Sequence, residues 1–281
     1  MCPFERVILA VTLTASDHDL LEYASLLRDL HILQAWQPVH VLGPGGRAQI
    51  PDFLSDRPLP VILGGAREDA LLSYTTAEKA DLILAGHRKQ KRGIRSLVRR
   101  LAMKAPCSVW MAPEGSPRRL SRILTPVDFS DRSASALEKA ALVAKAAGIE
   151  RLDALHVHFN SIAYTLDKDE QDMQEPVEDQ FWRFCARIDL HGVDVDFRSA
   201  DSPHVAETVN REAEKMNVDL IVMETRGRSR SAAVLLGSVT DQILMESTIP
   251  VLALKHFGAR MSLLKVLLDK EFQEKESPRF G

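Results

Sequence analysis

A glycine-containing loop and the helix predicted after it are the part of this sequence best suited to bind an anion. Gly227 is followed, after nine residues, by Gly237, Ser238 and Val239. A helix that begins directly after a glycine exposes backbone N–H groups, and the helix dipole adds partial positive charge there. The pattern predicts a phosphate site. The alternative stays open that Gly237 only turns the chain, while Ser238 and Asp241 form a capping box.

One carboxylate follows a predicted strand of the same region. The segment Ile123–Val127 is short, apolar and rich in β-branched residues, which is typical of a buried parallel strand, and Asp128 comes next. In an open parallel sheet, ligands bind beyond the carboxyl ends of the strands, where the strand order reverses. We therefore expect Asp128 to point into the same crevice as the glycine loop.

The elements that position these residues alternate between strand and helix. Apolar residues spaced as on one helix face, from Leu137 to Ala144, follow the first strand and predict a helix packed on a sheet. This alternation implies an α/β fold with a doubly wound parallel sheet. The later strands are predicted at Leu152–Val157, Val193–Phe197, Asp219–Met223 and Pro250–Leu254, and the later helices at His204–Lys215 and Val239–Glu246.

The same plan occurs twice in the chain. Segments of the first copy match the second at an offset of 116 residues near its start, 138 further on and 142 at its end. We therefore predict two tandem domains, at residues 1–115 and 119–257. The tail, residues 258–281, has apolar residues at helical spacing and is expected to cover a sheet edge or to pair with another subunit. The matches are 7–13 with 123–129, His40 with His156, Asp81 with Asp219, and Ser108 with Pro250.

Composition limits the class of protein. The chain has 281 residues, 45% hydrophobic and 27% charged, with a net charge of -3, so nothing attracts it globally to nucleic acid or to anionic lipid. Its three scattered cysteines favour neither a disulfide framework nor a zinc site. No apolar stretch approaches the ~20 residues that a membrane-spanning helix needs. We expect a cytoplasmic protein.

Taken together, Pro-Val-Asp-Phe-Ser at 126–130, His-Val at 156–157 and the Gly-x9-Gly-Ser-Val-Thr loop resemble the universal stress protein family. The likeness covers 120–256, and more weakly 5–112. It implies an adenine nucleotide alpha hydrolase-like fold and a pocket for ATP or AMP, with the acid and the second strand holding adenine. By position, the nucleotide-binding residues are Pro126, Val127, Asp128, Val157, Met223, Gly227, Gly237, Ser238 and Val239.

The sequence departs from that family pattern in both copies. Glu224 stands where the family has the first glycine of its loop, and a carboxylate about 4 Å from a phosphate charge costs on the order of 4 kcal/mol at an effective dielectric of ~20. In the first copy Thr12 replaces the acid Asp128, and Arg95 replaces Gly237. We expect no nucleotide in the first domain, which packs against the second instead.

These features predict a stress-response regulator that binds ATP or AMP in its second domain and acts through conformation or partner binding. No catalytic or metal-ligating residue is predicted, because the sequence lacks a Walker lysine, a Gly-x-Ser-x-Gly elbow and an HExxH motif. Two alternatives stay open. One is slow ATP hydrolysis, and the other is an interaction module that binds no nucleotide and has a pocket that is empty or holds an apolar ligand. Magnesium is left undecided. A homodimer is expected, and nucleic acid is not.

Two charged segments have simple structural interpretations. Residues 88–104 contain eight Lys or Arg and no acid, without the interleaved aromatic residues that stack on bases. They are interpreted as a solvated face or a partner for the acidic segment 160–184. That acidic segment is interpreted as a surface loop leading into a helix, with a lid over a pocket as the alternative.

Overall fold

The computed structural model describes residues 2–54, 57–87, 97–159, 176–225 and 236–255. Two halves, residues 2–113 and 120–255, alternate strands with helices. The strands of the first half are β1 (Phe4–Ala10), β2 (Leu33–Leu42), β3 (Val61–Gly64), β4 (Leu82–His87) and β5 (Ser108–Pro113). Its helices are α1 (Asp17–Asp29), the 3-10 turn η1 (Asp52–Leu54), α2 (Arg67–Ala77) and α3 (Leu97–Lys104).

The second half repeats this order. Its predicted elements are confirmed to within a few residues; the predicted helix His204–Lys215, for example, begins one residue later. The strands are β6 (Ile123–Pro126), β7 (Arg151–His158), β8 (Asp194–Asp201), β9 (Leu220–Glu224) and β10 (Val251–Leu254). The helices are α4 (Asp131–Ala146), α6 (Val177–Cys185), α7 (Val205–Lys215) and α8 (Ser238–Glu246).

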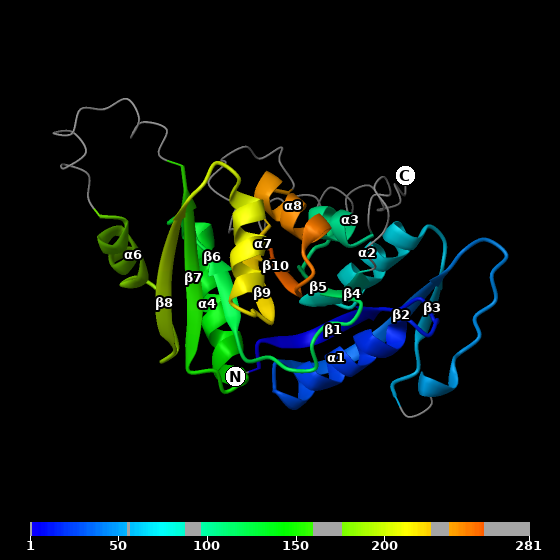
Figure 1. Ribbon diagram of the computed structural model, residues 1–281. Coiled ribbons are helices and arrows are strands. Elements are labelled where there is room, and N and C mark those ends of the chain that lie inside the picture. The colour runs from blue at the N-terminus through cyan, green and yellow to red at the C-terminus, as the bar shows by residue number, and fades with distance from the viewer. Residues whose placement is uncertain (1, 55–56, 88–96, 160–175, 226–235, 256–281) are drawn as a thin grey trace, which may run out of the picture.

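The strands of the described residues form one sheet of ten, in the order β3-β2-β1-β4-β5-β10-β9-β6-β7-β8 (Figure 1). Neighbours within each half run parallel, whereas β5 and β10 are antiparallel where the halves meet. Because of this reversal, the carboxyl ends of the strands lie at opposite edges of the sheet in the two halves. The predicted doubly wound α/β fold is confirmed.

Helices cover both faces of the sheet. One core cluster contains the buried side chains of α1, α4 and α6, and the other contains those of α2, α3, α7 and α8. Figure 1 shows α7, α8, α3 and α2 following one another across one face. Strands buried on both faces need apolar residues throughout, which explains why β6, β9 and β10 read as continuous apolar runs.

The contact between β5 and β10 relates the two halves by a pseudo-two-fold axis. Trp110 lies opposite Leu252, and these positions are related by the offset of 142 residues that superposes the two strands. A residue on a true two-fold axis meets its own copy. Here Trp110 is fully buried, with the rings of Phe4 and Tyr23 of its own half 6.3 and 6.1 Å away. It belongs to a core cluster that also contains Leu252 and the buried face of α4, so the halves share one continuous core.

Local contacts that start and end the elements recur in both halves. Asp81 accepts hydrogen bonds from the N–H groups of Glu5 (2.7 Å) and Arg6 (3.1 Å) at the start of β1. Asp219, the equivalent acid, accepts them from the N–H groups of Ser121 (2.8 Å) and Arg122 (3.1 Å) just before β6. Each acid thereby fixes the first strand of its half against the strand that occupies the next position in the sheet.

Candidate functional site

The carboxyl ends of β6, β7 and β9 meet at one edge of the second half. β6 lies between β7 and β9 and is parallel to both, so the strand order reverses at β6. Pro126 is the last residue of β6 and Val127 follows it, while Val157 and Met223 are next to last in β7 and β9. The fold therefore brings these four predicted residues, which are far apart in sequence, to the edge where α/β sheets bind ligands.

Asp128 lies at this edge but also organises the start of α4. Its Oδ1 accepts hydrogen bonds from the backbone N–H of Ser130 (3.1 Å) and from the Ser130 hydroxyl (2.6 Å). The Asp128 N–H donates in turn to the Ser133 hydroxyl at 3.3 Å. The carboxylate is half-buried, and a ligand that needs Oδ1 has to compete with Ser130.

The first turn of α8 faces the same edge. Gly237 is the N-cap, with φ -70° and ψ 147°, and Ser238 and Val239 are the first two helical residues. The Gly237 N–H donates to the Thr225 carbonyl (2.8 Å), which fixes the turn beside the end of β9, and the Asp241 N–H closes the first helical turn on the Gly237 carbonyl (2.8 Å). The N–H groups at this end of the helix are those that a phosphate would use.

The predicted capping box of Ser238 and Asp241 is wrong. Ser238 lies inside the helix rather than at its N-cap, and no side chain caps this end. Asp241 instead forms a two-pronged ion pair with Arg99 of α3, in the other half, with Nη2 to Oδ2 at 2.7 Å and Nε also bonded to Oδ1. A long-range partner has displaced the local hydrogen bond that the sequence suggested.

Glu224 is buried at the end of β9, with 8% of its surface exposed. Successive side chains of a strand point to opposite faces. Met223 belongs to the cluster under α7 and α8, whereas Leu220 and Val222 belong to the cluster under α4, so Glu224 points to the α4 face. Its carbonyl accepts a hydrogen bond from the Thr240 hydroxyl of α8 at 2.9 Å. The backbone of Glu224 thus supports α8 while its side chain points away from that helix.

A family model described as the universal stress protein family matches residues 120–255. The second half is a universal stress protein domain. The whole chain is similar to a putative universal stress protein from Pseudomonas aeruginosa UCBPP-PA14, at 16% identity and a TM-score of 0.69, over 95% of this chain and 98% of that one. It is also similar to a universal stress protein from Archaeoglobus fulgidus DSM 4304, at 18% identity and 0.63, over 91% and 97%. No curated protein matches by sequence.

The first half differs from the universal stress protein domain at the equivalent edge. Asp17 is 4% exposed and accepts hydrogen bonds from the N–H groups of Thr12 (2.9 Å) and Thr14 (3.2 Å) and from the Thr12 hydroxyl (3.0 Å). The offset of 116 makes Thr12 equivalent to Asp128, and Asp17 equivalent to Ser133. The sequence showed that the acid is missing at Thr12, but the role of Asp17 was not predicted. The available signal was that Asp17, an acid, occupies the position of the Ser133 hydroxyl.

Both halves place a histidine against the end of their central strand. His156 Nδ1 lies 2.8 Å from the Val127 carbonyl, and His40 Nδ1 lies 3.1 Å from the Val11 carbonyl. In the universal stress protein domain the His156 ring also stacks on Phe129, with centroids 4.3 Å apart. Across the described parts of the chain, His, Cys, Asp and Glu side chains nowhere gather in threes as a metal site would require.

The basic segment has partners other than the acidic one. Within its described part, Arg100 and Lys104 contact Glu68 of α2 at 2.6 and 2.5 Å, and Arg99 contacts Asp241. Residues 160–175 of the acidic segment lie outside the described residues, so its pairing with the basic segment stays a prediction. Of the acidic segment, α6 is described; it buries Phe181 against Phe197 of β8.

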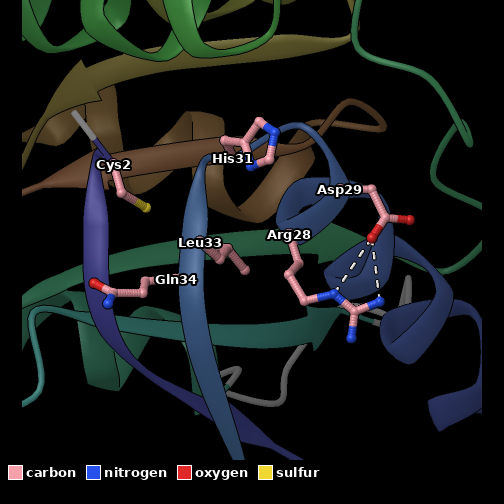
Figure 2. A pocket seen from close by; sticks show the side chains of 6 residues that line it. All are labelled: Cys2, Arg28, Asp29, His31, Leu33 and Gln34. Atoms are coloured by element: carbon pink, nitrogen blue, oxygen red, sulfur yellow. Dashed lines mark hydrogen bonds and ion pairs between the residues drawn. The ribbon is translucent and has the colours of Figure 1, made fainter.

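Several predicted features lie outside the described residues: Gly227, Arg95 and the tail 258–281. In the described residues, no helix is both long and apolar enough to cross a membrane. A hollow of about 540 Å³ opens at the amino ends of β1 and β2 and contains none of the predicted nucleotide residues (Figure 2). It is therefore distinct from the candidate site. Its lining is Cys2, Arg28, Asp29, His31, Leu33 and Gln34.

Proposed function

We propose that the universal stress protein domain binds an adenine nucleotide, ATP or AMP, and regulates a stress response through its conformation or its partners. The observation that carries this proposal is the convergence of β6, β7, β9 and the start of α8 at the strand reversal of the half that matches the family. The first half, where Asp17 is turned inward, binds no nucleotide.

The adenine end of the ligand is assigned to Asp128 and the main chain of Val157. The last residue of β6 to pair with β7 is Pro126, which lies opposite Leu155, so Val157 extends beyond the end of β6. His156 Nδ1 forms a hydrogen bond with the Val127 carbonyl, so the imidazole occupies the acceptor that follows the end of β6. Val157 pairs with Ala200 of β8 on its other side. A half-buried carboxylate beside the β6-facing edge of β7 can accept a hydrogen bond from an amino group, which supports adenine.

The phosphate end is assigned to Gly237, Ser238 and Val239. Their N–H groups belong to the first turn of α8, where the helix dipole favours negative charge by about 0.3–1 kcal/mol per interaction. Glu224, which a purely sequence-based view places next to phosphate, points to the opposite face of the sheet. This orientation separates the carboxylate from the first turn of α8 and so weakens the objection to an anion there.

We further propose that the nucleotide is a signal and not a substrate that is turned over. A ligand with different affinities for two conformations shifts their populations without any chemical step. A product assay on the wild type and on Asp128→Ala tests this. Robust phosphate release by the wild type that disappears in the variant would show that the protein is an ATPase.

A second candidate function is an interaction module that binds no nucleotide. The observation that favours it is the buried carboxylate of Glu224 in the strand that ends at the candidate site. Thermal melting with and without millimolar ATP separates the two functions, because a ligand that binds only the folded state raises stability by about 2.7 kcal/mol at a hundred times its Kd. An unchanged melting temperature supports the interaction module.

The first experiment identifies what freshly purified protein releases on denaturation and then titrates the apo protein with ATP. We expect one adenine nucleotide per chain. Gly237→Trp should abolish binding, because φ and ψ at this position suit any residue and the indole then fills the phosphate site. Asp128→Ala should weaken binding, whereas Thr12→Ala, its positional equivalent in the first half, should not. Equal effects of the last two variants would contradict the assignment to the second half.

A further inference from the structure

One ion pair connects the start of α8 to the first half. The side chains of Arg99 of α3 and Asp241 of α8 are 28% and 30% exposed. The Nε and Nη2 groups of the guanidinium donate hydrogen bonds to Oδ1 and Oδ2 of the carboxylate. Paired donors of this kind are stronger and more directional than single contacts. The pair is partly shielded from water, so it is screened less than a fully exposed one.

The two members of this pair occupy equivalent positions of the two halves. The offset of 142 that superposes β5 on β10 also takes position 99 to position 241. The contact therefore lies close to the pseudo-two-fold axis, where a dimer of identical halves would bring like charges together. This chain has an arginine on one side and an aspartate on the other, so the contact is attractive and the two halves are not interchangeable.

Asp241 has an electrostatic consequence for the first turn of α8. An acid there interacts favourably with the positive end of the helix dipole, and its negative charge opposes the binding of an external anion at the same helix end. A cation held against the acid cancels most of that competition. The neutralising charge comes from Arg99, and thus from the half that carries no nucleotide.

We propose that Arg99 is a positioning residue for the nucleotide site of the other half: by pairing with Asp241 it neutralises the acid in the first turn of α8 and leaves that helix end available to phosphate. The inference rests on the proposed nucleotide function and adds that the first half sets the affinity of the second. It predicts effects of opposite sign at the two members of one ion pair.

The experiment measures the Kd of the full chain for ATP and for adenosine. Arg99→Ala leaves the acid uncompensated and should raise the Kd for ATP about three- to tenfold, corresponding to dipole and charge effects of about 0.7–1.4 kcal/mol. Asp241→Ala should leave this Kd unchanged or lower it. The double variant should return to within about twofold of the wild type, since neither charge remains. Adenosine, which has no phosphate, should bind all four proteins alike.

The neighbouring arginine provides a matched control. Arg100 is on the same helix and contacts Glu68 within the first half, so Arg100→Ala removes an equal charge from α3 without exposing Asp241. It should change the Kd for ATP less than Arg99→Ala does. Equal losses in Arg99→Ala and Asp241→Ala, for ATP and adenosine together, would show a purely structural clamp and overturn the proposal.

The outcomes separate this inference from the proposed function. Wild-type protein that binds no ATP would overturn both. Wild-type protein that binds ATP, with an unchanged Kd in Arg99→Ala, would leave the nucleotide function intact and overturn the role of Arg99 alone.

Discussion

The carboxyl ends of β1 and β6 each combine one acid and one hydroxyl, but the two groups exchange places between the strand end and the following helix. At the end of β1 the hydroxyl of Thr12 stands on the strand and the acid Asp17 on the following helix, whereas at the end of β6 the acid Asp128 stands on the strand and the hydroxyl of Ser133 on the helix. Asp17 is buried and bonded to the strand end, while Asp128 is half-buried at the rim. One exchange of acid and hydroxyl thus separates a self-satisfied edge from one that can meet a ligand.

The largest expected effect concerns the β5–β10 pair, through which the two halves form one sheet. Trp110→Ala removes a fully buried indole from β5, the strand that pairs with β10 of the other half, and should lower the free energy of unfolding by about 3–5 kcal/mol. Denaturant titration followed by fluorescence and by circular dichroism measures this loss. If Leu252→Ala, the facing position, costs about 2–5 kcal/mol and both probes still coincide, the halves unfold together. Two separate transitions in the wild type would contradict a shared core.

The next effect contrasts the two acids directly. Asp17→Ala removes the buried carboxylate that accepts the hydrogen bonds of the Thr12 and Thr14 N–H groups. Losing these charge-assisted bonds should cost about 1–3 kcal/mol of stability and leave ATP binding unchanged. Asp128→Ala should cost less than about 1 kcal/mol, because its turn at Ser130 is half-exposed, and should weaken ATP binding. Melting and ATP titration of both variants measure the contrast. The comparison fails if Asp17→Ala weakens nucleotide binding as much as Asp128→Ala does.

The smallest effect concerns buried thiols at alkaline pH. Burial raises the pKa of Cys107, in the first half, to about 12 and that of Cys185, in the second, to about 11. Above the unfolded-state pKa of about 8.5, the unfolded chain releases protons that the folded state keeps, so stability falls as pH rises, by up to about 1.4 kcal/mol per pH unit for Cys107.

Unfolding titrations of the cysteine variants between pH 8 and pH 10.5 measure this decline. Cys107→Ala and Cys185→Ala should each flatten it, once the cavity cost at neutral pH is subtracted. Cys2→Ala, at a thiol that is only partly buried, is the matched control for removing a cysteine. A decline that persists unaltered in both buried-site variants would mean that their thiols do not hold protons in the folded state.

The elements were predictable because local pattern determines them. The apolar runs at β6 and β9 have the pattern of buried strands, and the alanines of α4 have helical spacing. Because the sequence repeats, the assignment of elements in one half supported the assignment in the other. The N-cap of α4 was equally local: the Ser130 hydroxyl accepts from the Ser133 N–H at 3.2 Å, and Gly148, at φ 70°, follows the end of the helix. The doubly wound parallel sheet of each half followed from the alternation of these strands and helices.

Long-range partners were not predictable in this way. Ser238 and Asp241 fit a capping box by spacing, but spacing carries no information about an arginine 142 positions earlier. Glu224 looked hostile to phosphate because a sequence does not reveal which face of a strand each residue occupies until its neighbours in the core are known. The inward turn of Asp17 was missed for the same reason, because a surface acid and a buried one have the same letter.

The antiparallel seam gives the molecule two unlike rims. One rim carries the loops that follow the strands of the second half and the turns that precede the strands of the first, and the other rim carries the reverse. A macromolecule bound over the candidate site would therefore meet carboxyl ends of strands from one half beside amino ends of strands from the other. The carboxyl ends of the first-half strands lie on the other rim, so the two rims present different residues to binding partners.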